Sequence, residues 1–128
     1  MNKLIIDVAN EKIFLMVITN FSIYNITHEN TKINYEKLTI IINDFLLSKS
    51  LKITDIGAIY INKAPGSFAG IRNSISIVKA FNVAKNVNYY CYNLDDFKDE
   101  SDLSYDNIPN LCKKYQIKKN LINPVHIS

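Results

Sequence analysis

The sequence predicts an α/β protein built on one mixed five-stranded sheet. Near the start, short β-rich runs are separated by polar pairs that fit tight hairpins. Two later segments carry apolar residues at helical spacing, and an apolar run follows each of them. A strand that follows a helix is expected to join a sheet in parallel. The length of 128 residues fits one domain.

The first three strands are expected in the ranges 4–8, 13–19 and 21–27. The pairs Asn10-Glu11 and Thr19-Asn20 separate them, which is typical of short hairpin links. Three strands joined in this way predict an antiparallel meander.

The first long helix is predicted from apolar residues that recur with a period of 3.6. They are Tyr35, Leu38, Ile41, Ile42, Phe45 and Leu46. Asn34 is expected to be the N-cap. The continuous apolar run 58–61 follows as a buried strand.

A second helix is expected to carry one apolar stripe, made of Phe68, Ile71, Ile75 and Val78. Before it, Pro65 and Gly66 are expected to bend the chain, and Ser67 is placed to cap the helix. The run 89–92 is the fifth strand. The predicted order is β-β-β-α-β-α-β.

The carboxyl-terminal part predicts an acidic linker and a last helix. The segment 95–106 has no periodicity and contains Asp95, Asp96, Asp99, Glu100, Asp102 and Asp106. Helical spacing then returns at Ile108, Leu111, Cys112 and Tyr115, with Pro109 in the first turn. Asn123-Pro124 is expected to end this helix, and 125–127 to form a short closing strand. The expected division is a lobe at 1–94, a linker at 95–107, and a helix with a short tail at 108–128 that packs on the lobe.

Composition argues against several classes of protein. The net charge is only +3, and the dense lysine patch at 113–119 is interpreted as a solvated helix face in preference to an RNA contact. Cys91 and Cys112 form no CxxC pair, and His28 and His126 stand alone, so no metal site is expected. No signal peptide and no membrane-spanning stretch is seen, and a cytoplasmic location is expected.

The turn between the fourth strand and the second helix has two interpretations. It reads Asn62-Lys63-Ala64-Pro65-Gly66-Ser67-Phe68-Ala69-Gly70-Ile71-Arg72. The free amides of such a helix start can receive an anion, and glycines permit close approach of a ligand. A capped helix with a glycine packed on the sheet is the stronger interpretation from physics alone. The string matches neither a P-loop nor a dinucleotide fingerprint.

Taken whole, this string resembles the GPGSFTGxR signature of the TsaB (YeaZ) family, with Ala64 and Ala69 in place of Gly and Thr. Leu4-Ile5-Ile6-Asp7 is similar to the family's opening strand, and the run 74–81 to its helix. The resemblance covers residues 2–97 and implies one lobe of the actin/Hsp70-like (ASKHA) ATPase fold. The stretch 121–128 is similar to the family's ending, so we expect an internal deletion of the second lobe with the acidic linker at the junction.

The resemblance implies a non-catalytic scaffold subunit in the synthesis of threonylcarbamoyladenosine on tRNA. TsaB relatives form a helical bundle with the catalytic paralog TsaD, an ATPase, TsaE, docks on the pair, and tRNA is contacted only indirectly. The residues expected to bind the TsaD-like partner are Ile40, Leu47, Ile77, Ala80, Phe81 and Ala84. The alternative is that further core, or the terminal helix, covers them.

A second group is expected to form a phosphate-binding or interface turn: Asp7, Pro65, Gly66, Ser67, Gly70 and Arg72. A structural salt bridge is an equal alternative for Arg72. No Thr or Ser follows Asp7 directly, and the second phosphate loop would lie in the missing lobe, so we expect no catalytic residues and no independent ATP hydrolysis. ATP or ADP at the partner interface is left open.

Two other functional classes remain: a nucleotide-binding enzyme of the same superfamily, and a self-associating module. Among TsaB relatives a homodimer through the same helices is also common in isolation, so a homodimer of this chain would not by itself separate these classes.

Overall fold

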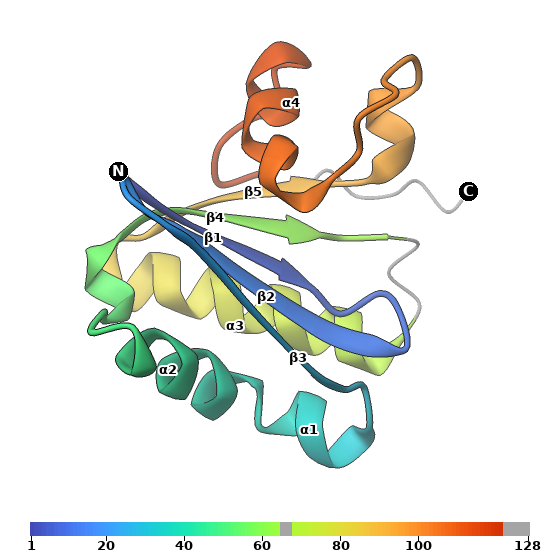
Figure 1. Ribbon diagram of the computed structural model, residues 1–128. Coiled ribbons are helices and arrows are strands. Elements are labelled where there is room, and N and C mark those ends of the chain that lie inside the picture. Colours follow the sequence, from blue (N-terminus) through green and yellow to red (C-terminus); the bar gives the residue numbers. More distant parts are fainter. Residues whose placement is uncertain (65–67, 122–128) are drawn as a thin grey trace.

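The computed structural model describes residues 1–64 and 68–121. Its strands form one mixed sheet in the order β3-β2-β1-β4-β5 (Figure 1). The bounds are β1 (Asn2–Asp7), β2 (Lys12–Ile18), β3 (Ile23–Glu29), β4 (Ile56–Asn62) and β5 (Asn88–Tyr92). The first three are antiparallel neighbours, and β4 and β5 join in parallel. The predicted α/β class and mixed five-stranded sheet are confirmed.

Helices α1 (Lys32–Glu36), α2 (Leu38–Ser48) and α3 (Ala69–Lys85) cover one face of the sheet (Figure 1). The predicted inner face of the first helix is confirmed, since Leu38, Ile42 and Leu46 are fully buried. The predicted cap is wrong: Thr31 is the N-cap, and its hydroxyl oxygen accepts from the backbone N–H of Asn34 at 3.2 Å. The helical segment is also divided, because it changes direction at Lys37.

The second long helix begins later than predicted. Its N-cap is Phe68, whose side chain makes no capping hydrogen bond, and Ser67 lies outside the described residues. Ile71 and Val78 are buried, as the predicted stripe requires, but Phe68 is 66 % exposed. The reason is positional: an N-cap residue has extended backbone angles, so its side chain does not continue the helical stripe.

The opposite face of the sheet is covered by the carboxyl-terminal segment (Figure 1). This segment contains the 3₁₀ helices η2 (Leu94–Phe97) and η3 (Tyr105–Asn107), and the helix α4 (Ile108–Lys114). Phe97, Ile108 and Leu111 are each at most 2 % exposed. Residues expected to form an acidic linker are therefore anchored on the sheet by an aromatic side chain that carries no periodic signal. The division into lobe, linker and tail stays a prediction. The predicted end of the last helix is wrong: α4 ends at Lys114, and the chain leaves the helix at Gln116, whose φ is +56°. Asn123-Pro124 and 125–127 lie outside the described residues.

The pleat of the central strand explains why there are two separate cores. Successive side chains of a strand point to opposite faces. Leu4 and Ile6 accordingly pack with α2 and α3, whereas Ile5 packs with Phe97 and Leu111. All three β1 side chains are fully buried, because β1 has a strand on each side and is covered on both faces.

The protein is expected to lose stability at alkaline pH, because the Tyr60 phenol is buried on the α4 side of the sheet. Burial, with smaller contributions from Tyr90 and Cys112, raises the pKa of Tyr60 to about 12. Its folded pKa exceeds the unfolded value of about 10, so the neutral phenol contributes stability below pH ~10 that is lost as the pH rises toward ~12. We expect Tyr60→Phe to lose less of its free energy of unfolding than the wild type between pH ~9 and ~11 in urea titrations. An identical decline in both proteins would contradict this.

None of the helices in the described residues combines the length and the apolar character needed to cross a membrane.

Candidate functional site

The residues singled out from the sequence lie in two regions of the structure. One is the outer surface of α2 and α3, which we call the helix face: Ile40, Leu47, Ile77, Ala80, Phe81, Val83 and Ala84. The other is the end of β1, where Asp7 is followed by Val8, which lines a cleft together with the start of α3.

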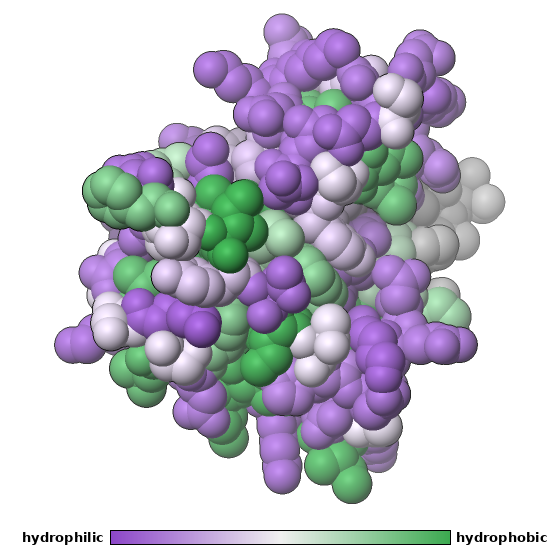
Figure 2. All heavy atoms as spheres, viewed as in Figure 1, coloured by the Kyte–Doolittle hydropathy of each residue, from purple (hydrophilic) through white to green (hydrophobic). Residues whose placement is uncertain are grey.

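The α2 part of the helix face is apolar and exposed. Ile40 and Leu47 are each 59 % exposed, and their spacing of two turns places them on the same side of the helix. Asp44 is the only ionisable residue among the eleven of α2. A helix that faces only solvent normally presents charged residues on that side. Figure 2 shows apolar residues over α1 and α2 among hydrophilic ones.

The α3 part differs from the prediction in its details. Ala80 and Ala84 are exposed, whereas Ile77 and Phe81 are half-buried and pack against the core beneath α3. Sequence reasoning missed Val83, which is 86 % exposed. The signal was available, since Val83 lies next to Ala84 and one turn after Ala80.

The terminal helix does not cover the helix face. Of the described residues, none after Cys91 belongs to the core cluster beneath α2 and α3. The α4 segment instead packs with Ile5, Tyr60 and Tyr92 on the other side of the sheet (Figure 1). The alternative in which the chain's last helix seals this surface is therefore wrong for the residues that the structure describes.

The second region is organised around a buried carboxylate. Asp7 is 3 % exposed at the end of β1. One carboxylate oxygen accepts from the backbone N–H of Ala9 at 2.8 Å. The other accepts from the Tyr105 hydroxyl at 2.9 Å and from the Asn62 side-chain amide at 3.3 Å. Asn62 in turn accepts from the backbone N–H of Ala64 at 2.9 Å, so the network ties β1 to the end of β4.

Two tyrosines of the carboxyl-terminal part share this environment. Burial and the Asp7 charge together raise the pKa of the Tyr105 and Tyr92 phenols. The Tyr92 hydroxyl is buried without a hydrogen-bond partner among the described residues. The Tyr105 ring also stacks on Phe14, with ring centroids 3.9 Å apart. A side chain that the sequence placed in a linker thus completes the surroundings of Asp7.

A cleft of about 830 Å³ opens beside this network. It is lined by the β1–β2 turn, Tyr35, Tyr105 and the start of α3 from Phe68 to Gly70. Gly70 is buried, and a Cβ there would approach the Tyr35 ring to 3.2 Å, which agrees with a packing role for this glycine. Arg72 is exposed in the first turn of α3. Pro65, Gly66 and Ser67 lie outside the described residues.

The acid–base chemistry available at this cleft is limited. Both oxygens of Asp7 already accept hydrogen bonds, which makes the carboxylate a structural anchor for Tyr105 and Asn62. Within residues 1–64 and 68–121, no group of three His, Cys, Asp or Glu side chains is arranged to hold a metal ion.

Loss of the Tyr105 hydroxyl is expected to weaken the fold. A hydrogen bond to a charged group is worth about 1.5–3 kcal/mol, and Tyr105→Phe removes the shortest of the side-chain bonds to Asp7. We expect a loss of about 2 kcal/mol in the free energy of unfolding, measured in urea. Tyr24→Phe is the matched control, because Tyr24 lies on the edge strand β3 and its hydroxyl makes no hydrogen bond to a described residue. Equal stabilities of the two variants would contradict the assignment.

Comparisons with known proteins bear on the fold. No protein-family model matches the sequence, and neither does any curated protein. Among solved structures, YeaZ from Pseudomonas aeruginosa aligns with a TM-score of 0.65 at 17 % identity, covering 72 % of this chain. Over most of its length this chain has the fold of YeaZ. A second structure, an uncharacterized protein from the same organism described as similar to peptidase YeaZ, aligns with the same values.

The match covers a larger share of this chain than of YeaZ. It covers 43 % of the YeaZ chain, so this protein spans less than half the length of the structures that it matches. The predicted likeness to TsaB (YeaZ) is confirmed as a likeness of fold.

Proposed function

We propose that this chain is a non-catalytic scaffold subunit of the TsaB type, which binds a TsaD-like catalytic subunit through the helix face. The observation that carries the proposal is that the carboxyl-terminal segment packs on one face of the sheet and leaves the outer surface of the helices on the other face exposed. The carboxyl-terminal segment closes one side, and the outer surface of α2 and α3 keeps exposed Ile40, Leu47 and Val83.

The helix face has the composition that a helix–helix contact requires. Ala80 and Ala84 are small and exposed, so a partner helix can approach α3 closely. Ile40, Leu47 and Val83 supply side chains to fill the grooves of that partner. Removal of these side chains from water on binding would favour the complex, by an amount that is reduced by the cost of association.

The TsaB resemblance supplies the wider role that we propose. The chain would hold the TsaD-like subunit in a productive arrangement for threonylcarbamoylation of tRNA in the cytoplasm, with a TsaE-like ATPase docking on the pair. It would touch tRNA only through its partner. We also assign the domain to the actin/Hsp70-like group, of which it would represent one lobe.

Independent catalysis is not part of the proposal. Asp7, the carboxylate that the resemblance aligns with a metal-holding position, is engaged by Tyr105, Asn62 and Ala9. The residues after it, Val8 and Ala9, carry no hydroxyl to hold a phosphate.

The cleft beside Asp7 supports a second candidate, nucleotide binding. Its volume of about 830 Å³ is in the range of small-molecule sites, and the seventeen-residue helix α3 starts at its wall. NMR titration of the ¹⁵N-labelled chain with ATP separates the two functions: shifts of the amides that line this cleft would favour a nucleotide-binding protein, and absence of such shifts favours the scaffold.

The scaffold function is tested by co-purification. Tagged chain is expressed with the TsaD-like subunit of the same organism, and the complex is purified by the tag. Threonylcarbamoylation of tRNA is then compared between this complex and the TsaD-like subunit without this chain. We expect a stoichiometric complex and modification that depends on the chain. A stable homodimer that ignores the TsaD-like subunit would instead indicate a self-associating module.

A further inference from the structure

A second pocket, of about 530 Å³, lies on the α4 side of the sheet and away from Asp7. It opens between the start of β1, the middle of β4 and β5, and the outer turn of α4. Its polar walls are Lys3, Tyr60, Tyr90, Asn110, Lys113 and Gln116. We call it the lysine–tyrosine pocket.

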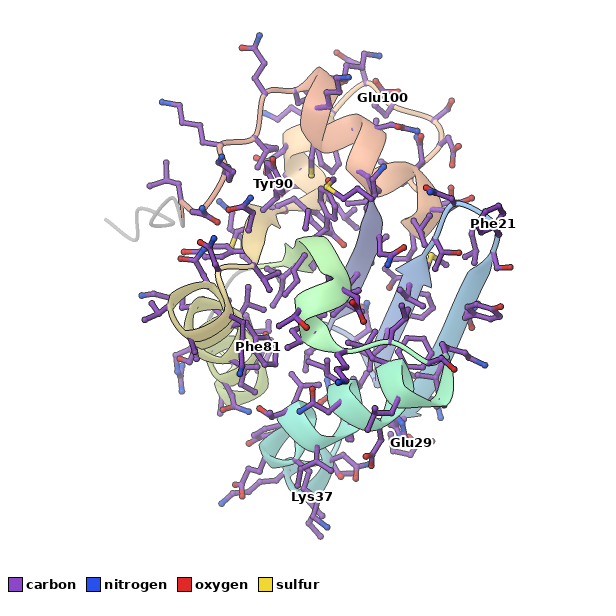
Figure 3. The ribbon with its side chains drawn as sticks, turned by 90° about the vertical axis from the view of Figure 1, so that its left-hand side faces the viewer. Phe21, Glu29, Lys37, Phe81, Tyr90 and Glu100 are labelled. Carbon is purple, nitrogen blue, oxygen red and sulfur yellow. The ribbon has the colours of Figure 1, made fainter. Side chains whose placement is uncertain are left out.

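Strand register explains how these residues meet. Lys3 lies two residues before Ile5, so both side chains point to the α4 side of the sheet. Ile5 pairs with Tyr60, and Tyr60 pairs with Tyr90 on β5. The Tyr60 and Tyr90 rings stack with centroids 5.1 Å apart (Figure 3 labels Tyr90). Two stacked phenols therefore lie beside a lysine from the neighbouring strand.

The fourth wall comes from α4. Asn110 and Lys113 lie one turn apart on α4, and Gln116 follows the C-cap residue Tyr115. All three line the pocket, while Leu111 is buried in the core beneath α4.

The pocket carries positive charge that the described residues do not neutralise. Neither Lys3 nor Lys113 forms an ion pair within residues 1–64 and 68–121, and no carboxylate lines the pocket. The adjacent Lys114 behaves differently, since it pairs with Glu100. From 107 to 121 the chain contains no Asp or Glu, and Lys118 and Lys119 add exposed positive charge nearby in sequence.

The pocket also contains two tyrosine hydroxyls that can donate hydrogen bonds to a ligand. The hydroxyls of Tyr60 and Tyr90 make no hydrogen bond to any described residue, although Tyr60 is only 6 % exposed. Neither hydroxyl oxygen is itself fully buried, so both can donate to a ligand oxygen that enters the pocket.

We propose that the lysine–tyrosine pocket binds a phosphate group, carried either by a free nucleotide or by an RNA strand. Lys3 and Lys113 supply the two positive charges, and the hydroxyls of Tyr60 and Tyr90 donate to phosphate oxygens. Ammonium groups are common phosphate partners in proteins, and a phosphate offers more acceptor oxygens than a carboxylate, which suits several convergent donors. The site is independent of the helix face, on the other side of the sheet.

The first experiment uses the isolated full chain labelled with ¹⁵N. It is titrated with inorganic phosphate, with AMP, and with a short single-stranded RNA, and the amide signals are followed. We expect shifts confined to residues around Lys3, Tyr90 and Lys113, with the helix face unchanged. Because no TsaD-like subunit is present, the result does not depend on the scaffold function.

Charge variants test the assignment of residues. Lys3→Gln combined with Lys113→Gln removes both charges, and Lys37→Gln is the matched control. Lys37 is also exposed and without an ion pair among the described residues, but it lies by α2 on the opposite side of the sheet (Figure 3). For RNA we expect the double variant to reduce the slope of log K against log salt concentration by about one to two, and Lys37→Gln to leave it unchanged.

The outcomes separate the sources of the phosphate. Saturable binding of AMP without RNA binding assigns the site to a free nucleotide, and binding of RNA with localised shifts assigns it to a nucleic-acid strand. Either result requires that the double variant weaken binding by at least ~10-fold relative to Lys37→Gln, a difference of about 1.4 kcal/mol. The proposal is overturned if no ligand shifts the pocket signals, or if the double variant and the control bind equally.

Discussion

Replacement of Ala80 by glutamate is expected to abolish the complex with the TsaD-like subunit and leave the fold intact. Ala80 is exposed on α3, so a glutamate there remains hydrated in the free chain. In the complex the same carboxylate would be buried against a helix without a partner, which costs about 3–5 kcal/mol. The dissociation constant should therefore rise by about 100-fold or more in a pull-down or calorimetric titration.

Phe21→Glu is the matched control for this prediction. Phe21 is 96 % exposed and lies at the turn between β2 and β3, away from the helix face (Figure 3). It introduces the same charge at an exposed apolar site, and we expect it to bind the TsaD-like subunit as the wild type does. If Ala80→Glu also binds normally, the helix face is not the interface.

The structure also changes which glutamate variants are informative. The sequence placed both Ile77 and Ala80 among the partner-binding residues, but Ile77 packs against the core beneath α3. A glutamate at Ile77 would destabilise the fold as well as any interface. Ile40 and Val83, which are 59 % and 86 % exposed, are better second sites.

Leu111→Ala is expected to destabilise the whole protein by about 3–4 kcal/mol. Leu111 is 2 % exposed and belongs to the core that α4 forms with Ile5 and Tyr60. Its truncation removes buried methyl groups and leaves a cavity between helix and sheet. Urea denaturation followed by circular dichroism measures the loss, and one cooperative transition is expected, because both cores share β1.

Leu103→Ala provides the comparison. Leu103 belongs to the same carboxyl-terminal segment but is 41 % exposed, so we expect a change of at most ~1 kcal/mol. A loss at Leu111 no larger than that at Leu103 would show that this segment is an appendage. It would then be separable from the sheet, against the expectation that the last helix packs on the lobe.

The helix face, the surroundings of Asp7 and the lysine–tyrosine pocket differ in how far the sequence could predict them. The helix face was predicted from spacing, because residues four and seven apart return to the same side of a helix whatever the helix packs on. The surroundings of Asp7 were not predicted, because its partner Tyr105 is 98 residues away in the chain. The lysine–tyrosine pocket depends on strand register and on the position of α4, and neither is a local property.

The sequence by itself determined the five strands, the order of the long helices and the buried side of α2. Periodicity of apolar residues is a local signal, and it places Leu38, Ile42 and Leu46 in the core without knowledge of the neighbours. Only the tertiary structure decided which side of the sheet the last helix covers. That choice depends on the two apolar faces of β1 and β4 and on the anchoring of Phe97, since each exposed sheet face must be buried by some element. Because α4 buries the face of Ile5 and Tyr60, it does not cover the outer surface of α2 and α3.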